Sequence, residues 1–195
     1  MADSVIRYQE IADLQNWRYI YSLLAIAWAF ALSVTVISRA QNGRERPFFE
    51  ILTHRMDVDV DGAPNAYGPP GKQTLDILLN AHYLNRADSE VVGYLSDEHS
   101  RPILQGPNDP FPGDYISQTA FTDIENQKER DPRRYVDARN INYVVRGDVA
   151  RRRGVRVGDF VSVYSKRTRR SVFAIVGDTG NPTGDEGSLH LMRRS

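Results

Sequence analysis

The stretch that decides the fold is Phe173–Leu191, FAIVGDTGNPTGDEGSLHL. It overlaps an apolar run, Val172–Val176, which predicts a buried strand that ends just before Asp178. A turn-rich connection over residues 179–185 then leads to Glu186 and a second apolar alternation. Two carboxylates at neighbouring strand ends suit general acid and base catalysis. A hairpin that merely carries polar residues in its loop is the alternative.

Three further motifs precede this stretch: Met56–Gly62 (MDVDVDG), Gln118–Phe121 (QTAF) and Asn142–Arg146 (NYVVR). Together with Gly177–Gly180 (GDTG) and Glu186–Ser188 (EGS), they resemble, in the same order, the motifs of the family 75 glycoside hydrolases, the chitosanases of fungi and actinomycetes. The resemblance spans residues 56–192, and its first and last motifs are the most specific.

The resemblance implies a mainly β fold, a small six-stranded double-psi-like barrel with few helices. It also implies an inverting hydrolase of β-1,4-linked glucosamine polymers, in which Asp178 and Glu186 are the catalytic pair. Because Asp178 follows an apolar strand, desolvation favours it as the acid and leaves Glu186 as the base. The reverse assignment stays open.

The Met56–Gly62 segment alternates valines with Asp57, Asp59 and Asp61, which predicts a strand with its carboxylates on one face. It lacks the glutamate that would complete an EF-hand loop. By resemblance, the three aspartates bind or organise the sugar substrate; a solvated strand edge is the alternative.

The N-terminal part contains twenty uncharged residues, Tyr19–Ser38, which as a helix would be about 30 Å long and match the hydrocarbon core of a bilayer. We expect residues 1–18 outside the membrane, a single span at 19–38, a linker at 39–47 and a chitosanase-like domain at 48–195. A buried soluble helix and a signal peptide are the alternatives. The basic residues barely decide the orientation, and the resemblance favours an extracytoplasmic domain.

Small residues recur every four positions in this span, at Ala25, Ala29 and Ser33. Such a row allows a partner transmembrane helix to approach closely, although alanine is common in any span.

The rest of the chain predicts one soluble helix, Lys72–Asn85, and a series of strands. The strands are expected at Val91–Leu95, Ser117–Phe121, Ile141–Arg146, Val155–Tyr164, Val172–Val176 and Gly187–Leu191. The chain has no cysteine, and its four histidines lie far apart, so we expect neither a metal site nor a cofactor.

Positive charge is concentrated in residues 130–195, which hold 15 Lys/Arg and 7 Asp/Glu, a net charge of +8; residues 1–129 hold 10 and 18, a net charge of −8. The runs Arg151–Arg153 and Lys166–Arg170 contribute most of it. They suit an anionic neighbour, such as lipid headgroups or an acidic protein surface, or are simply solvated. Nucleic acid is not expected, because the runs lack interleaved aromatic residues.

Two functions follow. One is a membrane-anchored, chitosanase-like hydrolase. The other is a non-catalytic accessory subunit of a larger integral-membrane complex, for example an energy-transducing one, which uses the same barrel as a scaffold.

Overall fold

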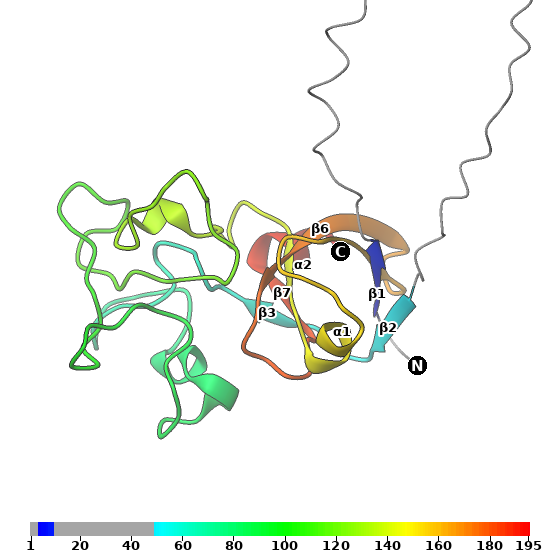
Figure 1. The fold of residues 1–195 in the computed structure, drawn as a ribbon, viewed down its shortest axis with the longest axis horizontal. Helices are drawn as coiled ribbons and strands as arrows, with labels where there is room; N and C mark the ends of the chain where they lie inside the picture. The colour runs from blue at the N-terminus through cyan, green and yellow to red at the C-terminus, as the bar shows by residue number, and fades with distance from the viewer. Residues whose placement is uncertain (1–3, 10–48) are drawn as a thin grey trace, which may run out of the picture.

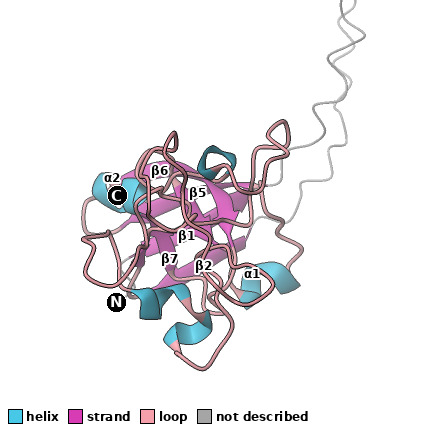
Figure 2. Cartoon of the chain, turned by 90° about the vertical axis from the view of Figure 1, so that its left-hand side faces the viewer, coloured by secondary structure: helices cyan, strands magenta, loops and turns pink. Residues whose placement is uncertain are grey.

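The computed structural model describes residues 4–9 and 49–195 (Figure 1). Its strands form one mixed sheet in the order β2-β1-β5-β6-β4-β7-β3, accompanied by two short α-helices (Figure 2). The prediction of a mainly β protein is therefore confirmed. The bounds are β1 (Ser4–Gln9), β2 (Phe49–Thr53), β3 (Asp57–Asp59), β4 (Tyr143–Val145), α1 (Asp148–Arg152), β5 (Phe160–Ser165), β6 (Arg170–Asp178), β7 (Glu186–Ser188) and α2 (Leu189–Arg194).

The antiparallel hairpin of β5 and β6 supplies much of one of the two hydrophobic clusters in the described part of the chain. Along β5, buried residues alternate with more exposed ones, so that Val161 and Val163 lie inside. They pack with Ala174 and Val176 of β6 in one cluster, which Leu191 of α2 also joins. This core supports the strand that ends in Asp178.

The first strand, β1, pairs antiparallel with both β2 and β5. Residues 4–9 therefore belong to the same sheet as the domain that was predicted to begin at residue 48. The predicted span, Tyr19–Ser38, and its small-residue row lie outside the described residues. Within residues 4–9 and 49–195, no helix has the length and apolar character needed to cross a bilayer.

Two parallel pairings bring the predicted motifs together. Strand β3 runs parallel to β7, with Asp57 beside Glu186, and β4 runs parallel to β6. The latter pair packs closely: a Cβ added to Gly177 would lie 2.6 Å from the Cβ of Tyr143. A side chain at position 177 would therefore push β4 away from β6.

The segment between β3 and β4 consists mostly of loops and forms a lobe beside the sheet (green in Figure 1). Three tyrosines stabilise it: Tyr94 contacts Tyr67 and Tyr115, with ring centroids 6.0 Å and 5.0 Å apart. The strands predicted at Val91–Leu95 and Ser117–Phe121 form isolated bridges here.

The predicted helix over Lys72–Asn85 was wrong. The segment contains two 3-10 helices instead, η2 (Leu78–Ala81) and η3 (Tyr83–Asn85). Its helically spaced apolar residues do not share a buried face, because Leu75 and Leu79 are exposed and only Ala81 of η2 is buried.

The last predicted strand was too long. Strand β7 ends at Ser188, whose side-chain oxygen accepts a hydrogen bond from the Leu191 amide at 3.1 Å and starts α2. The helix α1 and the late start of β5 at Phe160 were also not expected from the sequence.

Candidate active site

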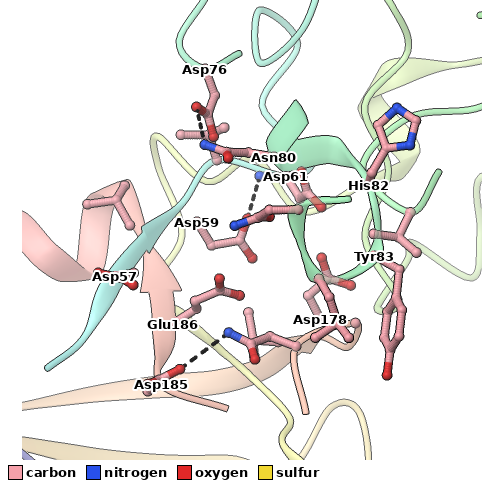
Figure 3. Close-up of a pocket in the computed structure, with 18 of the residues that line it drawn as sticks. Asp57, Asp59, Asp61, Asp76, Asn80, His82, Tyr83, Asp178, Asp185 and Glu186 are labelled. Carbon is pink, nitrogen blue, oxygen red and sulfur yellow. Dashed lines mark hydrogen bonds between the residues drawn. The ribbon is translucent and has the colours of Figure 1, made fainter. Parts of the chain in front are cut away.

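The carboxyl ends of β3 and β6 and the start of β7 surround a cavity of about 670 Å³ (Figure 3). Acidic side chains dominate its lining. They are Asp57, Asp59, Asp61, Asp76, Asp178, Asp185 and Glu186. Among the described residues that line the cavity, the basic side chains are Arg55 and His82. The cavity thus has a strongly anionic interior.

Asp178 occupies a fixed position at the end of β6 and is only 5% exposed. Its Oδ1 accepts hydrogen bonds from the amides of Ala120, at 2.9 Å, and Thr179, at 2.7 Å. These contacts join the QTAF and GDTG motifs. Because Oδ1 is occupied by two donors, a proton on this carboxyl group belongs on Oδ2.

Asp61 and Asp59 follow one another along the floor of the cavity. Asp61 is 8% exposed, and its Oδ1 accepts a hydrogen bond from the Tyr67 hydroxyl at 2.7 Å. Asp59 accepts a hydrogen bond from the Asp61 amide at 2.8 Å, and the Tyr143 hydroxyl donates to the Asp61 carbonyl at 2.9 Å. Tyr67 therefore holds the carboxylate of Asp61, and the turn itself holds that of Asp59.

Asp59, Asp61 and Asp178 form a cluster in which one carboxylate oxygen from each lies within 4.8 Å of those of the other two. A single hard cation fits such an all-oxygen ligand set, as do shared protons. In either case, the three negative charges require compensation, because they are buried close together.

Burial and mutual repulsion raise the pKa values of this group. Desolvation, followed by the charge of Asp59, raises the pKa of Asp178 well above its ordinary value, and Asp61 behaves in the same way. Desolvation raises the pKa of Asp59 to about 6, and that of Glu186 to about 7. Burial therefore shifts all four carboxyl groups towards the protonated form, and Glu186 titrates at about pH 7.

The return loop from Asp178 to Glu186 is held by its own polar residues. The Asn181 amide donates to Asp185 at 3.3 Å, and Thr183 also bonds to that carboxylate. Gly184 adopts a φ of +68°, and a Cβ there would lie 2.5 Å from the amide nitrogen of Gly147. The glycine is thus required where the loop crosses the backbone of the neighbouring segment.

The structure brings all the predicted soluble site residues to one cavity. Asp178 and Glu186 line it together, and so do Asp57, Asp59 and Asp61. Ala25, Ala29 and Ser33 lie outside the described residues. Three residues near the site, Tyr67, Asp76 and Asp185, lie in loops and carry no spacing signal in the sequence. Tyr143 lies in β4, within the NYVVR motif, but the motif did not indicate its hydrogen bond to Asp61.

The two basic runs lie away from the cavity. Arg151–Arg153, at the end of α1, are exposed, as are Lys166–Arg170 in the turn between β5 and β6. None of these residues lines the cavity. Positive charge on the surface and negative charge in the cavity are therefore separated. In comparisons with known proteins, no family model and no curated protein sequence matches this chain.

Proposed function

We propose that the domain hydrolyses β-1,4-linked glucosamine polymers with inversion of configuration. The observation that carries this proposal is the placement of Asp178 and Glu186, both with raised pKa values, in one anionic cavity. An inverting glycosidase needs one protonated and one ionised carboxyl group on opposite sides of the scissile bond. A raised pKa favours the protonated form of Asp178, while Glu186, with a pKa of about 7, is partly ionised near neutral pH.

In this mechanism, Asp178 is the acid and Glu186 is the base. Oδ2 of Asp178 donates its proton to the glycosidic oxygen as the bond from C1 to that oxygen breaks. Glu186 accepts a proton from a water molecule, whose oxygen bonds to C1 from the opposite face. Both carboxyl groups return to their starting states when the proton moves from Glu186 back to Asp178 through solvent.

The charge of the cavity supports a cationic substrate. A glucosamine polymer carries ammonium groups, and the carboxylates that line the cavity attract them over several ångströms. Asp57, Asp59 and Asp61 form the part of the lining proposed to bind sugar units. The exposed basic runs do not oppose this, because they lie outside the cavity.

The same proposal includes the finer fold, a six-stranded double-psi-like barrel, and attachment to a membrane through Tyr19–Ser38. The mainly β sheet and the parallel pairing of β3 with β7 support the first part. The length and uncharged composition of the segment support the second.

The test is hydrolysis of soluble chitosan by the full chain in mild detergent, measured by release of reducing ends. Asp178→Asn and Glu186→Gln should each abolish release while circular dichroism stays unchanged. Proton NMR of the first products should show the α-anomer. Full activity in either variant, or a β-anomer, would contradict the proposed mechanism.

The exposed basic runs also favour the second function, an accessory subunit that docks on an acidic partner. In that case, the Ala25/Ala29/Ser33 row packs against a partner helix. Ala29→Leu should then release the chain from a complex purified from native membranes. Purification of the wild-type chain alone would argue against this function.

A further inference from the structure

The lining of the cavity is not made of acidic side chains alone. It also includes Tyr83 and Leu84, together with Leu75 and Val92. The ring of Tyr83 is 38% exposed and stands on the far side of the cavity from Asp57 (Figure 3). An aromatic side chain is thus partly accessible at the edge of the cavity, on the side opposite Asp57.

Several hydrogen bonds fix the backbone at Tyr83. Its amide donates to the carbonyl of Glu90 at 2.8 Å, and its carbonyl accepts from the Ser89 hydroxyl at 2.6 Å. His82, on its N-terminal side, forms a bridge with Val91. The ring therefore projects from a closed turn with a fixed backbone.

The turn stores conformational strain next to this ring. Leu84 and Asn85 have φ values of 53° and 54°, in the left-handed region that favours glycine. This conformation is strained for leucine, whereas asparagine tolerates it, and such strain concentrates at ligand-binding sites. Leu84 is 53% exposed, so packing of its side chain in the core does not explain the conformation.

We propose that Tyr83 is a stacking platform for one pyranose ring of the substrate, in a subsite on the side of the cavity opposite Asp57. This inference rests on the proposed function. The C–H face of a β-linked sugar is apolar and suits an aromatic ring, whereas its hydroxyl and ammonium groups lie at the edge of the ring. With the face on Tyr83, these edge groups point along the cavity towards its carboxylates.

The experiment measures binding separately from hydrolysis. The full chain carrying Asp178→Asn is titrated with a glucosamine hexamer by calorimetry in mild detergent. Adding Tyr83→Ala should weaken binding about tenfold, in keeping with about 1.4 kcal/mol for loss of an aromatic contact. Tyr83→Leu should weaken it similarly, because it keeps apolar bulk without a ring face. Tyr83→Phe should bind within about twofold of the parent.

Phe173→Ala is the matched control, because this ring is 75% exposed on β6 and does not line the cavity. It should leave binding unchanged. If Tyr83→Ala and Tyr83→Leu bind the hexamer as tightly as the parent does, the proposal that Tyr83 is a stacking platform is refuted. Chitosan hydrolysis by the wild type would still support the proposed function. Absence of both hexamer binding by the parent and hydrolysis by the wild type would overturn both.

Discussion

Replacing Glu186 with glutamine should stabilise the protein above neutral pH. Burial raises the pKa of this carboxyl group from 4.5 to about 7, so the folded state holds the proton more tightly than the unfolded state does. The contribution of the protonated group is complete below about pH 4.5 and is lost as the pH rises through about 7. At about 1.4 kcal/mol per pH unit, the ionised group costs about 3 kcal/mol at pH 8. Solvent in the open cavity reduces this to about 1–3 kcal/mol.

The assay is urea unfolding of the full chain, followed by circular dichroism at pH 4.5 and pH 8. With a urea dependence of about 2 kcal/mol per molar, the midpoint of Glu186→Gln at pH 8 should lie about 0.5–1.5 M above that of the wild type. At pH 4.5 the two midpoints should agree. Glu98→Gln is the control, since the Glu98 side chain is 85% exposed. A Glu186→Gln midpoint at or below that of the wild type at pH 8 would refute the reasoning.

Three further predictions concern activity, packing and location. Chitosan hydrolysis should fall on the acidic side of about pH 7, because Glu186 must be ionised to act as the base; a rate that stays constant down to pH 5 would contradict that role. Gly177→Ala should lower the free energy of unfolding by about 1–3 kcal/mol in urea titrations, since its Cβ would lie 2.6 Å from that of Tyr143. Gly106→Ala, whose Cβ would meet no atom closer than 3.5 Å, should cost less. Carbonate extraction should leave the chain in the membrane fraction through Tyr19–Ser38, and its release would contradict membrane insertion.

Local patterns were enough to predict the strands that support the site. In β5, valines alternate with more polar residues, and β6 contains an apolar run. Both patterns involve residues that are neighbours in the sequence, so they predict which residues are buried. The sequence also allowed us to predict that Asp178 and Glu186 share a cavity, because only a short turn-rich connection separates them. The role of Tyr83 had no such signal, since its position depends on bonds to Ser89 and Glu90 in a strained turn.

Two kinds of feature could not be predicted from local sequence patterns: contacts made by long-range strand pairing, and segments whose apolar residues stay exposed. The contact of Asp59 and Asp61 with Asp178 depends on the parallel pairing of β3 with β7 across more than a hundred residues, and only the family resemblance suggested it. The helix predicted at Lys72–Asn85 failed because periodicity indicates a helix only if the apolar side is covered. Here Leu79 is 42% exposed and the side is uncovered.

The pairing of β1 with β2 restricts how many times the segment between them can cross a membrane. Tyr8 lies opposite Phe49, so the chain leaves the sheet after Gln9 and returns at the same end. A segment whose two ends lie on one side of a bilayer crosses it an even number of times or not at all. A single crossing by Tyr19–Ser38, as proposed above, therefore requires β1 to leave the sheet.

Pairing of β1 in the sheet therefore competes with insertion of Tyr19–Ser38 as a single membrane span. Release of Ser4–Gln9 would permit a single crossing and would place these residues on the opposite side of the bilayer from the acidic cavity. Insertion of the anchor would then open the edges of β2 and β5 to another strand.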